Sequence, residues 1–540
     1  MAYLEPHRRP LLAQNPPGSQ RIDYDSIPPE QDSVESIQNN DLDSLFDPSI
    51  YGSGTLSRTS AYIIVISRII GTGIFATPGI IAKSVGSIGL SLSVWLIGAA
   101  IAATNLTVWL EYGCMLPCSG GHKIYLEFTY RYPRFLASTL IAVQAVLLTF
   151  TTGNCVVFGQ YLLFALDIEA TDFNRKLFAA GLLTGIVVIH SCFLRTGIWL
   201  QNALGWVKII LIVFIAWAGI YVVLSTQRNY LGASPGLSKF SWDNLWQHSN
   251  WSLLTLSTAM FKVSYAYAGL NNVNTVLSEV KNPIPTLKLV APAALVTAAL
   301  LYLLTNIAYF CVIPLEEIKQ SGELIAALFF ERVFASGLGK TLLPLAIAIS
   351  AAGNVMVVSF TAARLNQEIA RQGFLPFSGL LSTSRPFSAP LGGFLVHYIP
   401  SFLVIILSPS DDVYSFILDV EGYPVQMITL ALSIGLLVLR YRRPDLPRPF
   451  KAWTFAVWIS IIFSIGLLAA PFFPPADGKG DVNFFYATYA IVGVGILTLA
   501  AIYWYFWAVL IPRWKGYVIE EEKETLDDGT CITKLVRSLR

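Results

Sequence analysis

The chain has 540 residues, of which 54% are hydrophobic and only 13% are charged, and its mean hydropathy is +0.58. Soluble domains carry about 25% charged residues. This composition therefore indicates a protein of the lipid bilayer and argues against a water-soluble globular protein. The formal net charge of +2 argues against a polyanion such as nucleic acid as a partner.

Residues 1–58 differ in composition from everything that follows. They are rich in Pro, Ser, Asn and Asp, and they contain nine Asp and Glu against four Arg and no Lys. Such a segment cannot bury enough apolar surface to fold, so we predict a disordered acidic cytosolic tail. No apolar core follows a basic start, and we therefore predict no signal peptide.

Twelve apolar segments follow the tail, and a span needs about 20 such residues. We predict an all-α integral membrane domain over residues 59–512, with a tail at 513–540. Lys and Arg concentrate in alternate loops, and the positive-inside rule then places both termini in the cytosol. The predicted spans are 59–83, 87–113, 135–166, 173–194, 198–225, 251–278, 286–313, 340–372, 388–408, 412–440, 451–473 and 483–511.

The first predicted span contains a break. Its residues 68–79 read RIIGTGIFATPG, in which three glycines, two threonines and a proline interrupt the apolar run. Backbone that faces lipid must keep all its hydrogen bonds, so an unwound turn is stable only where it lines a cavity inside the protein. Glycine supplies the backbone freedom and the room for such a turn.

The sixth span has a matching interruption, because Tyr265 to Asn271 are small, polar and glycine-containing at mid-depth. Paired interruptions at corresponding positions of two five-helix halves indicate a transporter site at the bilayer midplane. Free amides favour a carboxylate and free carbonyls favour an ammonium, so a zwitterionic amino acid fits both. The alternative, tight GxG packing between helices, explains Gly71 and Gly73 but not the second break.

Five motifs resemble those of the L-type amino acid transporters, members of the amino acid–polyamine–organocation superfamily. Two of them look most like the motifs of the fungal high-affinity methionine permeases: IIGTGIFATP and GGHKIYLEF. The resemblance implies inverted repeats over 59–225 and 251–440, discontinuous helices 1 and 6, and two extra helices over 451–511. The motifs are IIGTGIFATP (69–78), SGGHKIYLEF (119–128), SEVKNPIPT (278–286), SFTAARLNQEIARQGFLP (359–376) and LRYRRPDLPRPFK (439–451).

The same resemblance implies where a substrate binds. In the family the first break holds the carboxylate through backbone amides and a hydroxyl, and carbonyls of both breaks hold the ammonium. Tyr265 stands where the family often has a gating Phe, and Ala268 replaces a common Gly. Because of these departures, the resemblance does not determine which substrate side chain is preferred. The implied residues are Thr72, Gly73 and Ile74 for the carboxylate, and Ile69, Tyr265 and Ala268 for the ammonium.

Lys208 lies inside the fifth predicted span. A lysine at the centre of a membrane helix costs about 2.5–3.5 kcal/mol on insertion scales, so such residues usually have a function. The family often has a lysine here, which resembles a stand-in for a coupling sodium ion between helices 1, 5 and 8. We expect Lys208 to take this role and to be a candidate carrier of the coupled proton. The alternative is a lysine that reaches the cytosolic interface.

Asp419 and Glu421 lie several residues into the tenth span. Carboxylates inside a membrane helix are candidates for tuning substrate choice or for accepting a proton. The alternative, that they line a wet outer vestibule, is equally compatible with the sequence.

The remaining motifs exclude other kinds of chemistry. The six cysteines show no metal-type spacing, so we predict no zinc site. No Walker sequence is present to bind ATP, and we predict neither a cofactor nor an enzyme. Animal L-type transporters are linked to a single-span subunit through a cysteine in the loop between spans 3 and 4. The corresponding loop, residues 167–174, has no cysteine, so we expect no such partner.

Together these observations predict a plasma-membrane symporter that takes up neutral, methionine-like L-amino acids with protons by alternating access. Two alternatives remain, an uncoupled amino acid exchanger and a transporter-like nutrient receptor. The usual mark of the receptor class, a very long cytosolic extension, is absent from the sequence.

Overall fold

The computed structural model describes residues 57–117, 121–149, 151–225, 241–275, 277, 280–334, 338–383, 389–407, 413–474, 485–525 and 531–539. The predicted N-terminal tail, residues 1–58, lies almost entirely outside these residues. The chain separates into the units Met1–Tyr51 and Gly52–Arg540, and everything below concerns the second.

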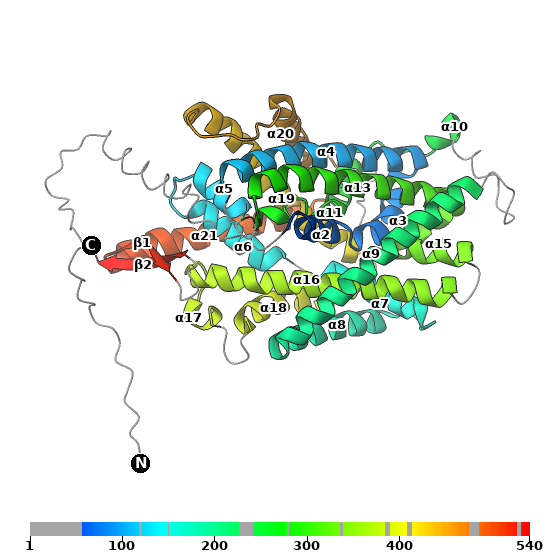
Figure 1. Cartoon of the computed structure of the whole chain (residues 1–540), viewed down its shortest axis with the longest axis horizontal. Helices are drawn as coiled ribbons and strands as arrows, with labels where there is room; N and C mark the ends of the chain where they lie inside the picture. The colour runs from blue at the N-terminus through cyan, green and yellow to red at the C-terminus, as the bar shows by residue number, and fades with distance from the viewer. Residues whose placement is uncertain are drawn as a thin grey trace, which may run out of the picture. The chain divides into compact units, whose positions relative to one another are not determined.

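Helices make up nearly all of this unit (Figure 1). The first part of the chain forms α2 (Arg58–Ile69), α3 (Gly73–Val85), α4 (Ile88–Met115), α5 (His122–Thr129), α6 (Leu136–Leu148), α7 (Thr152–Ala165), α8 (Asp172–Cys192), α9 (Leu194–Ser225) and α10 (Trp242–Leu245). The middle part forms α11 (Leu253–Ala266), α12 (Asn272–Thr275), α13 (Pro283–Val312), α14 (Leu315–Gln320), α15 (Ile325–Phe334), α16 (Leu343–Arg371) and α17 (Ser378–Leu381).

The last part forms α18 (Leu391–Leu407), α19 (Val413–Arg442), α20 (Thr454–Ala469), α21 (Thr488–Trp504) and α22 (Ile511–Lys515). It ends in two strands, β1 (Tyr517–Thr525) and β2 (Cys531–Leu539). Short 3-10 turns occupy Gly322–Leu324 and Ala470–Phe472, and π-helical turns occupy Leu338–Leu342 and Tyr505–Leu510.

Among the described residues, nine helices are long and apolar enough to cross a membrane, and two further apolar helices, α3 and α18, are shorter. The protein is therefore a multi-pass membrane protein, as the composition indicates. Each of the twelve predicted ranges contains a helix, but the number of spans and the inverted repeat stay predictions.

Polar side chains set several helix boundaries. Ser57 and Ser87 accept hydrogen bonds from Ser60 N (3.1 Å) and Leu90 N (3.3 Å), so their hydroxyls cap the first turns of α2 and α4. Gly86 ends α3 with a φ of +82°, a left-handed conformation that glycine adopts at little cost.

The third predicted span, 135–166, corresponds to the candidate span Leu136–Ala165, which contains an interruption. Helix α6 ends at Leu148 and α7 begins at Thr152. Between them, the Thr151 hydroxyl lies 3.3 Å from Nε2 of His397 on α18. The run of threonines followed by glycine is poor in helix formers, and a histidine from another helix gives the buried Thr151 hydroxyl a hydrogen-bond partner.

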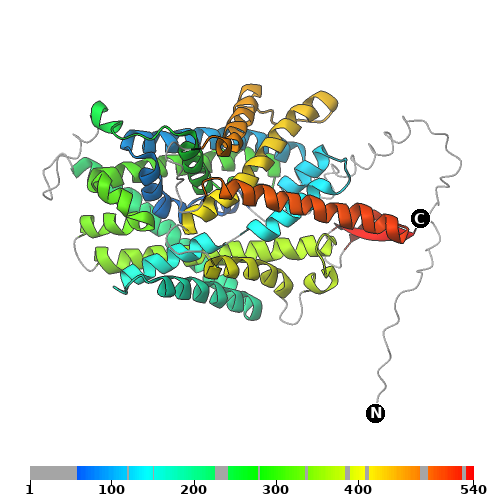
Figure 2. The ribbon, with the colours of Figure 1, turned by 180° about the vertical axis from the view of Figure 1, so that it is seen from behind.

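The prediction of an all-α protein is wrong for the C-terminal tail. Strands β1 and β2 pair antiparallel, with Tyr517 opposite Leu539. Figure 2 shows the chain running from α21 into this hairpin. Tyr517, Ile519 and Leu535 pack in one cluster with Phe374, which follows α16, and with Trp504 and Trp507 at the end of α21 and just after it. The hairpin therefore buries apolar side chains against the ends of the membrane helices.

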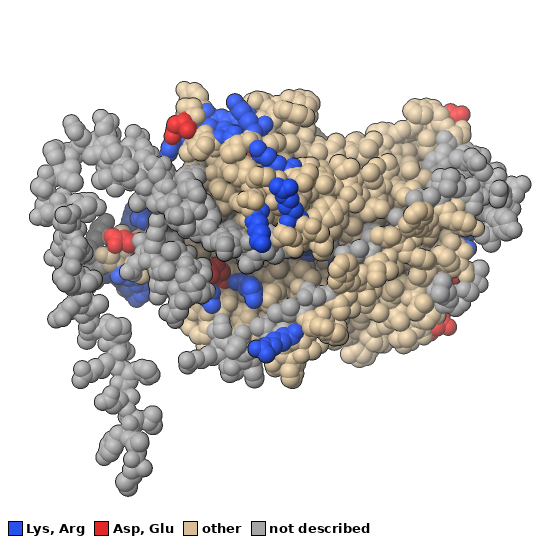
Figure 3. Space-filling model, in the orientation of Figure 1, with Lys and Arg blue, Asp and Glu red and all other residues tan. Residues whose placement is uncertain are grey.

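Charged residues gather toward the same end of the molecule. Figure 3 shows most of the visible Lys and Arg over the half that carries α5 and the hairpin. One carboxylate there is buried, because Glu111 at the end of α4 accepts hydrogen bonds from Arg440 Nε (3.0 Å) and Ala452 N (2.7 Å). This contact joins α4, α19 and the segment that leads into α20.

Candidate functional site

The structure has the interruption that we predicted in the first span. Helix α2 ends at Ile69 and α3 begins at Gly73. The first intrahelical donors of α3 are Phe75 N and Ala76 N, which both bond to Thr72 O (3.1 and 3.0 Å). The amides of Gly73 and Ile74 precede them, and such first-turn amides have no acceptor within their own helix. They lie at the positive end of the α3 dipole, and Gly73 lines the cavity described below whereas Ile74 does not.

The sixth span has its interruption too. Helix α11 ends at Ala266 and the short helix α12 begins at Asn272. Between them, Gly269 has a φ of +110°, in the region that glycine alone adopts readily. The Ala268 amide turns back to bond with Tyr265 O at 3.0 Å, and the Tyr267 amide is shared between Tyr265 O and Val263 O.

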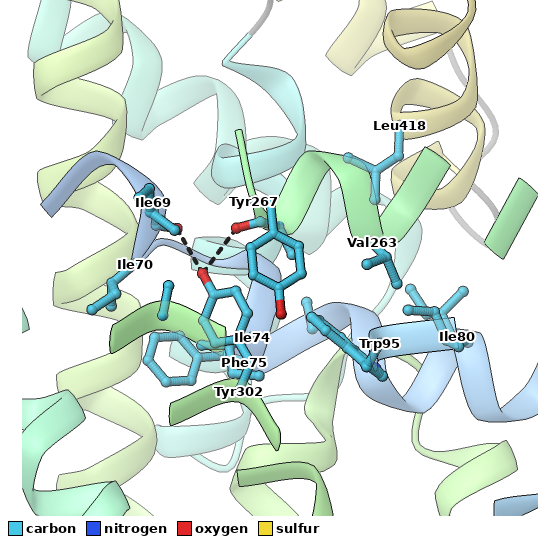
Figure 4. Packing of buried hydrophobic residues seen from close by; sticks show 14 of the residues in the cluster. Ile69, Ile70, Ile74, Phe75, Ile80, Trp95, Val263, Tyr267, Tyr302 and Leu418 are labelled. Carbon is cyan, nitrogen blue, oxygen red and sulfur yellow. Dashed lines mark hydrogen bonds between the residues drawn. The ribbon is translucent and has the colours of Figure 1, made fainter. Parts of the chain in front are cut away.

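The two interruptions lie against each other. A Cβ built on Gly73 would come within 2.9 Å of the Ala266 Cα, so the start of α3 touches the end of α11. The Tyr302 hydroxyl of α13 is 2.8 Å from Ile69 O and 2.9 Å from Ala266 O, and Figure 4 shows it between the two breaks. One buried tyrosine thus contacts both helix ends.

A cavity of about 300 Å³ lies beside the two breaks. Its wall combines peptide groups of the breaks, polar side chains and an apolar face formed by α6, α16 and α19. The cavity is lined by Arg68, Ile69, Gly71, Thr72, Gly73, Gln144, Thr149, Asn154, Tyr265, Ala268, Asn354 and Glu421, with Ile141, Ala145, Leu148, Val358 and Val425 on the apolar face. Small-molecule sites typically have this composition, a mostly apolar wall with a few convergent polar groups.

A row of buried hydrogen bonds supports the first break. Thr72 Oγ1 donates to Asn154 Oδ1 (2.6 Å), and Asn354 Nδ2 donates to the same oxygen (2.9 Å). The Lys208 ammonium donates to Asn354 Oδ1 at 3.3 Å. Lys208 is 3% exposed, so its charge lies inside the protein and not at the interface. The row links α9, α16 and α7 to the first break.

Of the sequence-predicted residues, six line the cavity, namely Ile69, Thr72, Gly73, Tyr265, Ala268 and Glu421. Ile74 is buried in the core directly after them. Lys208 reaches the cavity only through Asn354, and Asp419 lies away from the cavity wall.

Asp419 has an environment that the sequence analysis did not foresee. Both of its carboxylate oxygens lie 3.4 Å from the ammonium of Lys262 on α11. The two side chains are 3% and 0% exposed, so this is a buried ion pair between α11 and α19. Neither a wet vestibule nor direct contact with a substrate in the cavity fits this arrangement.

Sequence reasoning missed several residues of the cavity. Arg68 belongs to the motif that marks the first break, yet the sequence led us to predict no function for its charged side chain. Asn154 and Asn354 lie between small residues in the middle of apolar segments, TTGNC and SAAGNV. An amide side chain in the middle of a span indicates a buried polar partner, as Lys208 does, because lipid offers it no hydrogen bond.

This geometry defines a class of protein. A multi-pass membrane protein with a partly polar cavity beside two facing helix interruptions has the architecture of a membrane transporter. The sequence model of the amino acid permease family matches residues 56–497, so the chain belongs to that family. It is an amino acid transporter and not an enzyme.

The relatives point in the same direction. The high-affinity methionine permease of Saccharomyces cerevisiae is 32% identical, over 90% of this chain and 84% of the permease. The low-affinity methionine permease of the same yeast is also 32% identical, over 88% of this chain and 87% of that protein. The human cystine/glutamate transporter is 28% identical, over 75% and 77% of the two chains.

Proposed function

We propose that the protein is a proton-coupled symporter that takes up neutral L-amino acids with a methionine-like side chain by alternating access. The observation that carries the proposal is the cavity beside the two helix breaks, where peptide groups and an apolar face meet. The names of the two yeast relatives supply the methionine-like class.

The proposed binding mode places the two ends of a zwitterion at the two breaks. The carboxylate binds the amides at the start of α3 and the Thr72 hydroxyl, where the helix dipole is favourable. The ammonium binds carbonyls at Ile69, Tyr265 and Ala268. The Ile69 carbonyl already accepts a hydrogen bond from Tyr302, so the ammonium takes its second lone pair.

The apolar face of the cavity is the proposed seat of the substrate side chain. It consists of aliphatic residues from three helices, including Leu148 of α6, Val358 of α16 and Val425 of α19. An unbranched thioether or aliphatic chain loses little by leaving water for such a surface. One methylene changes discrimination by only about 1–3 kcal/mol, which fits a permease for several neutral amino acids.

Lys208 is proposed to replace a coupling cation. Its ammonium is connected to the first break through Asn354, Asn154 and Thr72. A movement of α9 or α16 would therefore shift the groups proposed to bind the substrate. Tyr265 is the proposed gate, because it lies in the last turn of α11 and borders the cavity. Lys208 and Glu421 are the two candidates for the proton itself.

We further propose a plasma-membrane location with both termini in the cytosol and no disulfide-linked single-span subunit. The loop between α7 and α8 is the place where such a linkage occurs in the animal relatives, and it has no cysteine. Co-purification of a single-span subunit under non-reducing conditions would overturn this part of the proposal.

Uptake of labelled L-methionine into proteoliposomes tests the function. We expect accumulation above equilibrium only with an inward proton gradient, because coupling requires a driving ion. Flux that requires an amino acid on the opposite side indicates an exchanger instead. Binding without flux under either condition indicates a receptor.

A further inference from the structure

Two side chains of opposite charge line the same cavity. Arg68 comes from the last turn of α2 and Glu421 from α19. Ionisable residues at this depth are costly, so a transporter that keeps two of them in its substrate cavity is expected to use them.

The position of Arg68 depends on the second break. A Cβ added to Gly269 would lie 2.5 Å from Arg68 Cγ and 3.1 Å from Arg68 Cβ. The aliphatic stem of Arg68 therefore packs directly on Gly269. With its stem held there, the Arg68 side chain borders the cavity between the breaks.

Arg68 and Glu421 share one cavity without forming a direct contact. In the part of the chain that the structure describes, neither side chain has an ion-pair partner within 4.0 Å, and opposite charges that line one enclosed cavity attract each other. Arginine stays charged in proteins, whereas a carboxylate can take up a proton. Of the two, only Glu421 can therefore change its charge.

The other ionisable groups near Glu421 have roles elsewhere. On α11, Tyr265 borders the cavity, and Lys262 is paired with Asp419, which is outside the cavity lining. Lys208 on α9 is bonded to Asn354. The remaining helices on α19 contribute Tyr161 of α7, bonded to Phe75 O, Glu111 of α4, bonded to Arg440, His122 of α5, bonded to Asn271, and Tyr489 of α21, packed on Tyr423.

We propose, building on the proposed function, that Glu421 takes the transported proton and that Arg68 binds the substrate carboxylate only while Glu421 is protonated. A proton from the outer solution neutralises Glu421, and the Arg68 guanidinium is then free to bind the substrate beside the α3 amides. When the cavity opens inward, Glu421 gives the proton to the cytosol. Its carboxylate then competes for Arg68 and displaces the substrate.

This competition makes proton and substrate binding cooperative. Each ligand raises the affinity for the other by the same factor, because the two binding equilibria are linked. One proton enters and one leaves per cycle, with no other bond made or broken. Lys208 fits the proton role less well than Glu421, because it contacts Asn354 and lies outside the cavity wall.

The direct test is equilibrium binding of L-methionine to the purified full chain between pH 5 and pH 8. For the wild type we expect affinity to rise on acidification, by at most about tenfold per pH unit for one linked proton. Glu421→Gln mimics the protonated carboxyl, and its affinity should vary by less than about twofold over the same range. Arg68→Met should bind at least about tenfold more weakly than the wild type at pH 5, since it lacks the charged partner of the carboxylate.

Two matched variants complete the test. Glu421→Asp keeps the carboxylate and should keep the pH dependence, as should Glu316→Gln, which removes an exposed carboxylate that is not part of the cavity lining. If Glu421→Gln does not fold, the comparison of Arg68→Lys with Arg68→Met decides, because only the charged variant should bind more tightly in acid. Wild-type pH dependence in Glu421→Gln or in Arg68→Met would overturn the inference.

Failure of the proposed function has a different signature. A wild-type protein that binds none of the twenty amino acids, or whose uptake ignores the proton gradient, contradicts that proposal whatever the variants do. If the wild type is driven by protons and Glu421→Gln is driven equally, the function stands and Lys208 becomes the remaining candidate for the proton.

Discussion

At the scale of single residues, the first break depends on a row of four side chains. Lys208, Asn354, Asn154 and Thr72 satisfy one another's polar groups in a region with little access to water. Leaving one member of such a row without a partner costs about 1–3 kcal/mol. Lys208 is the member of the row outside the cavity wall, so its substitution is expected to change the cavity through Asn354.

Lys208→Met should weaken substrate binding and reduce proton-driven uptake, since the Asn354 carbonyl loses its donor. We expect a loss of about 1–3 kcal/mol in substrate affinity, measured as the KM of methionine uptake. Lys176→Met is the control, because Lys176 makes a partly exposed ion pair with Asp172 that contributes little. Unchanged proton-driven uptake in Lys208→Met would show that this lysine has no coupling role.

Gly73→Ala should be far more damaging than its size indicates. The new methyl group would lie 2.9 Å from the Ala266 Cα, where backbone blocks it, and overpacking of this kind costs about 1–3 kcal/mol. We expect methionine uptake to fall at least about fivefold. Gly185→Ala on α8 is the matched control, because an added Cβ there meets nothing within 4 Å. Equal uptake by the two variants would rule out close contact between the breaks.

At the scale of helices and strands, the sequence identified what is encoded locally. Glycines and threonines grouped inside an apolar run marked the first break, and Gly269 with its polar neighbours marked the second. The break in the third span passed unnoticed because its stabilising partner, His397, is 246 residues away in the chain. The roles of Asn154 and Asn354 were not predicted for the same reason, since the two residues bond to each other across helices that are distant in the sequence.

The C-terminal hairpin was missed because a strand has no fixed structure without its partner. Residues 517–525 read as a charged tail, and only pairing with 531–539 and a surface near Phe374 make them a strand. Packing against helices is what stabilises an otherwise marginal two-stranded hairpin.

Leu535→Asp should therefore loosen the hairpin. Leu535 packs among Phe374, Tyr517 and Ile519, and its amide donates to Gln372 O at 3.4 Å. Burial of a leucine contributes about 1.5–3 kcal/mol when complete, so this partly buried one should cost about 1 kcal/mol. A lower Tm in detergent checks the effect. Glu520→Ser, at an exposed position of the same hairpin, should leave the Tm unchanged, and an equal drop in both would contradict the packing.

At the scale of the whole molecule, the alternation of charge predicts which loops face the cytosol. Glu169, between α7 and α8, and Asp445, after α19, are both exposed and lie on opposite predicted sides. In Glu169→Cys, a membrane-impermeant maleimide should label intact cells more strongly than in the wild type. Asp445→Cys should show extra labelling only after permeabilisation. The reverse pattern would invert the topology and place both termini outside.

Tyr302 has a consequence for the carrier as a whole. A phenol owns a single hydrogen, yet this one stands within bonding distance of two acceptors on separate segments, at 2.8 and 2.9 Å. At any instant it can serve one of them fully. The same hydroxyl therefore connects the end of α2 to the end of α11, and a shift of either segment would change which of the two carbonyls receives its hydrogen.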